Sequence, residues 1–400
     1  MTTRRAVLTG FAGVALAAAA PLTGADRNAR LFDQVWDEVD RRYWDRDRLG
    51  DAWNDAYARY RPQALAAADG AALYRILSAM LATVGDSHVY IRAPDAVRYD
   101  AARDAGTDSA QFGLSTYPID GAWRVLSVRA GGPAAAAGVR PGWVLTAVDG
   151  HAIDEDWHPA PGQHGRFTFR DLADRPRTLD LVSVLLPPEP ARRATRLPDD
   201  MLLIGFEAFE DDTARWIADR LDEDPPAALI LDLRDNEGGE ALAVARVAGL
   251  LFPERRTLLK RVARGRTLAI PIVPARRRAF LGPVAVLVGP RSASGAEILA
   301  ALVQDSGRGR VIGEPTAGAV TGAARTALPD GGELWVAVFD IRTAADRRLE
   351  GVGITPAIPV SQSLAQLRAG VDPAMIRATA LLRSAIAVGP ATPASMLNGG

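Results

Sequence analysis

Two serines at the start of one helix-like segment are the first candidates for chemistry. Ser292 and Ser294 follow the apolar run VAVLVG and precede AEILAALVQD, whose apolar residues recur with helical spacing. A serine at a helix start is either an N-cap, whose hydroxyl accepts a backbone N–H, or a nucleophile whose developing oxyanion faces the N–H groups of the first turn. Spacing alone does not separate the two serines.

A nucleophilic serine needs a general base, and this composition offers few. The chain has no cysteine, and Lys260 is its only lysine. Arginine is a poor base because its pKa stays above ~12. Of the four histidines, His151, His158 and His164 are expected as exposed loop residues in or beside a β-rich segment. His88 lies in VGDSHVYI, between a predicted helix and a predicted strand, and is therefore the best candidate base.

A glycine pair follows a predicted buried strand in LDLRDNEGGEA. Gly238 and Gly239 either let backbone N–H groups approach a ligand closely or form a plain turn. This loop and the Ser294 loop both follow predicted strands, at the edge where open α/β sheets place their sites. No spacing typical of a zinc, calcium or phosphate site is found, so no metal and no cofactor is expected.

The chain divides into segments of different pattern. Residues 26–104 predict helices that end in the strand bearing the Ser-His pair, and residues 105–190 alternate like short strands. Residues 191–385 alternate strand and helix, which is α/β order. Residues 386–400 are rich in Ala, Pro, Gly and Ser, and we expect a flexible tail there.

The N-terminus and the overall charge bear on location. Residues 1–25 carry Arg4 and Arg5 before an apolar run that is shorter than the ~20 residues of a membrane span. They predict a removable export signal, of the twin-arginine type or a plain secretory one. We therefore expect an exported, periplasmic or extracellular protein without stable membrane insertion. The formal net charge of −1 gives no chain-wide attraction to nucleic acid.

The β-rich segment resembles a PDZ domain, chiefly in the stretch GGPAAAAGVRPGWVLTAVDG. The positions that match the family's carboxylate-binding loop are Phe112, Gly113, Leu114 and Ser115. The resemblance implies that a peptide C-terminus binds there by strand addition. The alternative is a module that only packs against its neighbour.

Most of the chain after residue 25 resembles the tail-specific serine peptidases, also called C-terminal processing peptidases, and the core of tricorn protease. The matching motifs, in order, are GDSHVYI, GPAAAAGVRPGWVLTAVDG, LILDLRDNEGG, SASGAEILAALVQDSGRGRVIGEPTAGA and EGVGITPAIPV. The resemblance implies an α/β fold with a ClpP/crotonase-like catalytic core, an inserted PDZ domain and an N-terminal helical subdomain.

The same resemblance implies roles for individual residues. The family motif makes Ser294 the nucleophile and puts the lysine of many members at Ala319, so a Ser/Lys dyad is not available here. The tricorn-type branch uses a histidine in a Ser-His pair and a glutamate, which correspond to Ser87, His88 and Glu350. The implied oxyanion donors are the backbone N–H of Gly238 or Gly239 and that of Gly295.

The sequence therefore predicts an exported serine endopeptidase that cleaves peptides or protein C-terminal regions, with substrate C-termini as its partners. One alternative is an inactive peptidase-like scaffold that binds peptide C-termini. Another is a crotonase-like acyl enzyme that acts on esters or thioesters.

Overall fold

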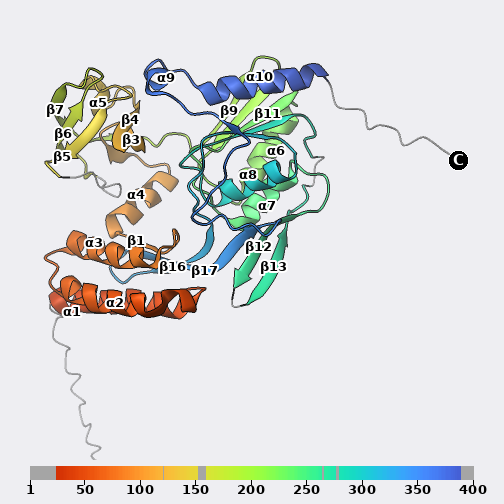
Figure 1. Cartoon of the computed structure of the whole chain (residues 1–400). Coiled ribbons are helices and arrows are strands. Elements are labelled where there is room, and N and C mark those ends of the chain that lie inside the picture. The colour runs from red at the N-terminus through yellow and green to blue at the C-terminus, as the bar shows by residue number, and fades with distance from the viewer. Residues whose placement is uncertain (1–23, 120, 152–158, 264, 276–278, 389–400) are drawn as a thin grey trace, which may run out of the picture.

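The computed structural model describes residues 24–119, 121–151, 159–263, 265–275 and 279–388 (Figure 1). Most of the predicted export signal and of the predicted tail lies outside these residues. The helices are α1 (Gly24–Arg42), α2 (Arg46–Leu65), α3 (Gly70–Leu81), η1 (Ala82–Val84), α4 (Pro94–Asp104), α5 (Pro133–Ala136), α6 (Thr213–Glu223), α7 (Ala241–Gly249), α8 (Gly295–Asp305), α9 (Leu364–Arg368) and α10 (Pro373–Val388). The strands are β1 (Tyr90–Arg92), β2 (Ser109–Gln111), β3 (Leu114–Ile119), β4 (Ala122–Val128), β5 (Val144–Val148), β6 (His164–Arg170), β7 (Pro176–Val182), β8 (Val184–Leu186), β9 (Arg192–Leu197), β10 (Met201–Phe206), β11 (Ala228–Asp232), β12 (Thr257–Ala263), β13 (Arg266–Pro271), β14 (Val284–Val288), β15 (Arg310–Gly313), β16 (Thr321–Ala327), β17 (Glu333–Thr343) and β18 (Ile358–Pro359).

A six-stranded sheet in the order β18-β15-β14-β11-β10-β9 forms the middle of the C-terminal half of the chain, residues 191–388. Neighbouring strands are parallel except β9, which runs antiparallel to β10 at one edge. Every residue of β11 and β14 is buried, as parallel strands covered on both faces require. Leu229 and Leu231 pack with helices α6, α7 and α8, while Ile230 packs with Ala378 and Leu382 of α10. The mixed α/β class predicted from the sequence is confirmed.

A second sheet joins the start of the chain to its C-terminal half. Its order is β1-β17-β12-β13, and β16 pairs antiparallel with β17. Helices α1 to α3 cover this sheet through a shared core that includes Phe32, Leu77 and Val336 (Figure 1). Because β1 pairs with β17, the residues just before β1 are brought against the segments around residues 320 and 350.

The β-rich segment forms a module with its own core. An antiparallel sheet in the order β3-β4-β5-β6-β7 encloses Val125, Phe167 and Phe169, with α5 packed against it. Strand β3 is an edge of this sheet. His164, expected in a loop, is instead the first residue of β6. The identification of this module as a PDZ domain stays a prediction.

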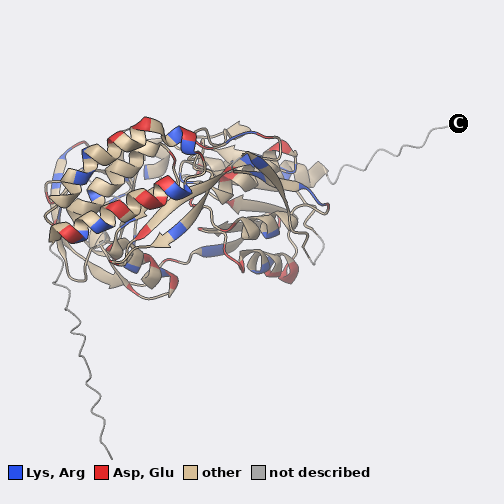
Figure 2. Ribbon diagram, turned by 90° about the horizontal axis from the view of Figure 1, so that it is seen from below, with Lys and Arg blue, Asp and Glu red and all other residues tan. Residues whose placement is uncertain are grey.

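Acidic and basic residues alternate along the helices seen from below in Figure 2, so neither sign dominates that view. Among the described helices, none combines the length and the apolar character that crossing a bilayer requires.

Candidate active site

Ser294 occupies the turn between β14 and α8. Its φ of 49° and ψ of −109° are rarely adopted by residues other than glycine, and such strain gathers at functional sites. Its N–H donates to the Ala319 carbonyl (2.8 Å) and to the Glu297 carboxylate (3.0 Å). These two bonds hold the backbone in this conformation and leave the side chain half-buried at the N-terminus of α8.

Ser292, the competing serine, has a different environment. It is fully buried, and its hydroxyl donates to the Leu233 carbonyl (2.7 Å) and accepts the Gly289 N–H (3.0 Å). Both of its hydrogen-bonding roles are therefore used inside the loop. This difference favours Ser294 as the nucleophile, a choice that sequence spacing alone could not make.

The glycine turn lies directly against Ser294. A Cβ added to Gly238 would lie 2.6 Å from the Cβ of Ser294, and φ at Gly238 is 107°. The N–H of Gly238 already donates to the Asn236 side chain (2.9 Å). Within the described part of the chain, the N–H groups of Gly239 and Gly295 have no hydrogen-bond partner. Of the three predicted oxyanion donors, these two are the available ones.

Asn236 holds the turn in place and was not singled out from the sequence. Its buried side-chain amide donates to the Phe206 carbonyl (2.9 Å), and its backbone carbonyl accepts the Ala293 N–H (3.0 Å). It thereby ties the glycine turn to the loop that carries Ser294. The only sequence signal was its position just before two glycines, which does not indicate these contacts.

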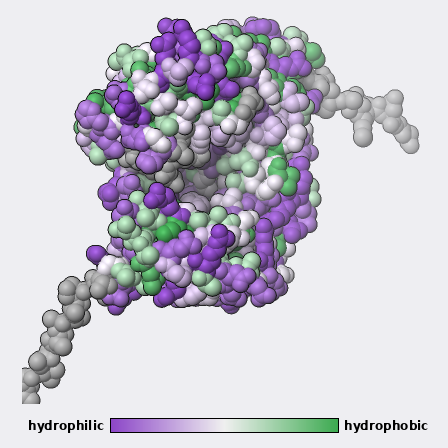
Figure 3. Space-filling model, turned by 60° about the vertical axis from the view of Figure 1, so that its left-hand side comes forward, coloured by the Kyte–Doolittle hydropathy of each residue, from purple (hydrophilic) through white to green (hydrophobic). Residues whose placement is uncertain are grey.

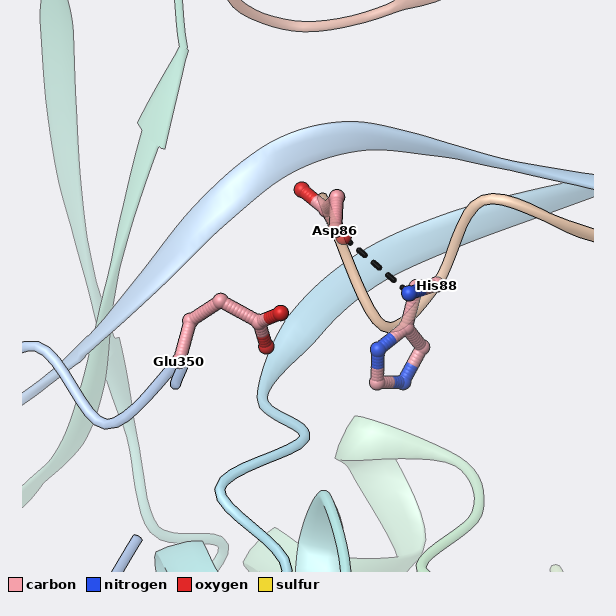
Figure 4. Close-up of side chains that lie close together, drawn as sticks. All are labelled: Asp86, His88 and Glu350. Atoms are coloured by element: carbon pink, nitrogen blue, oxygen red, sulfur yellow. Dashed lines mark hydrogen bonds between the residues drawn. The ribbon is translucent and has the colours of Figure 1, made fainter. Parts of the chain in front are cut away.

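The histidine and the glutamate, 262 residues apart in number, meet through Ser87. The Oγ of Ser87 lies 2.8 Å from Nδ1 of His88 and 2.9 Å from Oε2 of Glu350. The Ser87 N–H donates to Oε1 (2.8 Å), and the Val320 N–H donates to Oε2 (2.7 Å). Figure 4 shows the Glu350 carboxylate facing the His88 side chain from another segment. The predicted Ser87, His88 and Glu350 are therefore side by side.

This chain of hydrogen bonds fixes the position of a proton. An ionised carboxylate only accepts, so the hydroxyl of Ser87 donates to Glu350. The Ser87 oxygen then accepts from Nδ1–H of His88, which leaves the lone pair on Nε2. That tautomer is the one a general base requires.

The environment of His88 also keeps the imidazole neutral. Burial lowers the pKa of His88 below its ordinary value, while the negative charges of Glu350 and Asp86 oppose that shift. A neutral imidazole at physiological pH can accept a proton.

A second carboxylate, that of Asp86, lies beside this pair and was not singled out from the sequence. Ligand atoms of Asp86, His88 and Glu350 lie within 4.8 Å of one another, a spacing that a metal ion could use. The carboxylate oxygens and Nδ1 are already engaged, because both carboxylates accept several hydrogen bonds and Nδ1 contacts Ser87. The network is satisfied by protein groups.

Ser294 and His88 are connected indirectly. Among the described residues no hydrogen bond joins them, but the segment Ala319–Val320 contacts both sides. Glu297, fully buried, accepts the N–H of Ala319 (2.9 Å) and that of Ser294 (3.0 Å). Ala319, expected from the resemblance to occupy the position of the family lysine, therefore lies against Ser294.

Lys260, the only lysine of the chain, makes its contacts in a different part of the fold. Its Nζ pairs with Asp346 (3.2 Å), and it lies on β12 opposite Arg342 of β17. The structure gives it no contact with Ser294 among the described residues.

A cleft of about 520 Å³ lies between the β-rich module and the C-terminal half of the chain. Figure 3, in which the left-hand side of Figure 1 is turned forward, shows a hollow between the upper and lower parts of that face. The cleft is lined on one side by Gly113, Leu114 and Ser115 and on the other by Gly238 and Gly239. It thus brings the predicted peptide-binding loop and the predicted oxyanion turn to one opening.

Phe112, the remaining residue of the predicted loop, is buried in the core of the module. Its carbonyl accepts the Ala134 N–H (2.9 Å). Its side chain thus supports the loop from inside the module.

Comparisons with known proteins bear on the family and the fold of this chain. Residues 200–360 match the model of peptidase family S41, and residues 26–82 match that of the tricorn protease C1 domain. The chain is 28% identical to the chloroplastic carboxyl-terminal-processing peptidase 2 of Arabidopsis thaliana, over 86% of this chain and 71% of the relative. It is also 28% identical to tricorn protease homolog 1 of Streptomyces coelicolor, over 92% of this chain and 36% of the relative.

A solved structure, the photosystem II D1 C-terminal processing protease, has the same fold. Its TM-score is 0.59 at 24% identity, and the match covers 85% of this chain and 94% of that one. The family match spans the glycine turn, Ser294 and Glu350, and the C1 match spans helices α1 to α3. The match to peptidase family S41 over residues 200–360, together with relatives named as carboxyl-terminal-processing peptidases, indicates a serine peptidase, a hydrolase of peptide bonds.

Proposed function

We propose that this protein is an exported serine endopeptidase that cleaves peptides or the C-terminal regions of proteins with Ser294, His88 and Glu350. The observation that carries the proposal is the hydrogen-bonded chain from Glu350 through Ser87 to Nδ1 of His88. This chain of bonds leaves Nε2 of His88 as the free basic atom. A lysine base is not available, because Ala319 occupies the position expected for the family lysine.

The steps follow from this arrangement. Ser294 Oγ attacks the scissile carbonyl as Nε2 of His88 takes its proton, and the imidazolium later protonates the leaving amine. The N–H groups of Gly239 and Gly295 stabilise the tetrahedral oxyanion, an effect of about 3–4 kcal/mol per donor in comparable sites. Catalytic hydrogen bonds commonly shorten only in the substrate complex. The Ser294–His88 contact is expected to form at that stage.

The module at residues 105–190 supplies the substrate site in this proposal, as a PDZ domain inserted before the peptidase core at 191–385. Strand β3 begins at Leu114 and is an edge of its sheet, so an extended peptide can add to it. Its first residues line the same cleft as Gly238 and Gly239. A substrate C-terminus bound on β3 would thereby place the preceding residues toward Ser294.

Export through residues 1–25, by the twin-arginine route, completes the proposal. Support comes from the basic and apolar pattern of that segment. Curated relatives are named as chloroplastic enzymes, so they too are sorted to a compartment other than the cytosol.

A second candidate is an inactive scaffold that binds peptide tails. Two observations favour it, namely Ala319 at the lysine position and the missing Ser294–His88 hydrogen bond among the described residues. Cleavage of an unstructured protein, followed by mass spectrometry, separates the candidates. We expect internal peptide bonds to be cut, less so when the C-terminus is amidated, and not at all by Ser294→Ala. Intact substrate that still binds would support the scaffold, and ester or thioester turnover alone would support a crotonase-like enzyme.

A further inference from the structure

Asp86 is a buried carboxylate for which the proposed mechanism has no role so far. Its side chain is 8% exposed and receives donors from four residues. These donors are the His88 N–H (3.0 Å), the Thr321 hydroxyl (3.0 Å), the Tyr43 hydroxyl (3.1 Å) and the Trp44 indole N–H (3.5 Å). The dashed line in Figure 4 marks the contact with His88.

One carboxylate oxygen of Asp86 faces the catalytic network. Oδ1 accepts the backbone N–H of His88 and the hydroxyl of Thr321. Thr321 directly follows Val320, whose N–H holds Glu350. Val320 and Thr321, the second of which begins β16, therefore fix the two carboxylates beside the imidazole. Movement of Asp86 would shift His88 relative to Glu350.

The other oxygen faces the N-terminal helices. Oδ2 accepts from Tyr43 and Trp44, which directly follow α1. Tyr43 is fully buried, and burial together with Asp86 raises the pKa of Tyr43 far above its ordinary range, so its hydroxyl remains a donor. Arg48 of α2 also donates to the Gly85 carbonyl (3.0 Å) in the same loop.

We propose that Asp86 is a positioning residue that sets the place of the catalytic base and makes it depend on the docked end of helix α1. This inference rests on the proposed function of His88. It assigns the N-terminal helices a part in catalysis, because their contact with Asp86 fixes the backbone of the base. No Asp86 oxygen touches the reacting atoms, so its effect passes through His88.

The first test is Asp86→Asn, which keeps the size of the side chain and removes its charge. We expect kcat to fall by about 10–100-fold, as for other supporting partners of functional histidines, with KM changed less than about twofold. The charges that face the imidazole are those of Asp86 and Glu350, and both raise the pKa of His88. Loss of one of them moves the acid limb of the pH–rate profile to lower pH. A structural role alone would lower stability and leave that limb in place.

The second test is a matched pair of tyrosine variants. Tyr43→Phe removes the donor to Asp86, and we expect about a tenfold lower kcat. Tyr57→Phe removes an equivalent hydroxyl in α2, which donates to Asp33 (3.1 Å) without contact to the base loop. We expect similar losses of thermal stability from both but wild-type kcat for Tyr57→Phe. Equal kcat values for the two variants would overturn the proposal, and this pair stands even if Asp86→Asn does not fold.

A readout without turnover separates this inference from the proposed function. The chain has four histidines, so the His88 imidazole can be assigned by NMR with His88→Gln as the reference. Its titration should move to lower pH in Asp86→Asn whether or not the wild type cleaves peptides. An unchanged titration overturns the inference, whereas an inactive wild type with a shifted titration overturns only the proposed function.

Discussion

Replacing Glu350 by glutamine tests the electrostatic part of the site. Glu350 and His88 have polar atoms within 4.8 Å of each other. A carboxylate and an imidazolium at that separation attract by about 3–4 kcal/mol at an effective dielectric constant of ~20. The reaction forms an imidazolium, so Glu350→Gln should lower kcat by roughly two to three orders of magnitude.

Two further effects act in the same variant. The Glu350 carboxylate accepts one backbone N–H on each oxygen, from Ser87 on Oε1 and from Val320 on Oε2. The glutamine amide of the variant therefore places its NH₂ next to a backbone N–H in either orientation. That conflict should cost about 1–3 kcal/mol of folding free energy. If the amide donates to Ser87 Oγ, the hydroxyl turns toward Nδ1 of His88 and favours the tautomer that lacks the basic Nε2.

The assay is the pH dependence of kcat/KM for a fluorogenic peptide. Glu350 raises the pKa of His88, so removal of its charge lowers that pKa. The acid limb of the pH profile then shifts to lower pH, and the plateau value of kcat/KM falls. Glu223→Gln, an exposed glutamate of α6 paired with Arg220, is the control and should behave as the wild type. A Glu350→Gln enzyme within about threefold of wild-type kcat, with an unmoved acid limb, would refute the reasoning.

Three further outcomes are expected. Ser292→Ala should lower the free energy of unfolding, measured by urea denaturation, by about 1–3 kcal/mol, because two buried backbone groups lose their hydrogen-bond partner. Ser294→Ala should instead abolish cleavage with little loss of stability. Gly238→Ala should abolish cleavage, since the added Cβ would meet Ser294. The control is Gly307→Ala, at a glycine that also has a positive φ but has open space around it, and this variant should only lose stability. Equal activity of the two variants would be evidence against the glycine turn as part of the site. Gly113→Ala, whose Cβ would lie 3.1 Å from the next loop, should raise KM for peptides with a free C-terminus about tenfold, and an unchanged KM would argue against that loop as the peptide site.

The sequence predicted the pieces of this site better than their connections. Strands β11 and β14 were recognisable because fully buried parallel strands read as unbroken apolar runs. The choice of His88 followed from composition, since few bases were available. The choice between Ser292 and Ser294 needed either a family motif or the structure, because burial of a hydroxyl is not encoded in spacing.

What the sequence did not predict depends on contacts between distant segments. Asp86 lies next to the Ser-His pair in the printed sequence, but its role arises only from Tyr43 and Thr321, which come from other parts of the chain. Glu297 looks like an ordinary residue of a helix N-terminus, yet it is fully buried and holds the Ala319 segment. Such carboxylates are recognised only once the fold supplies their donors.

The central claim is that His88 removes the proton from Ser294, and the rate of covalent labelling of Ser294 by a fluorophosphonate measures this step without a peptide substrate. If His88 is the base, the labelling rate should follow a single ionisation below the ordinary histidine pKa of about 6.5. Labelling should also disappear in Ser294→Ala and fall at least a hundredfold in His88→Ala. Labelling of Ser294 at the wild-type rate in His88→Ala would contradict the claim.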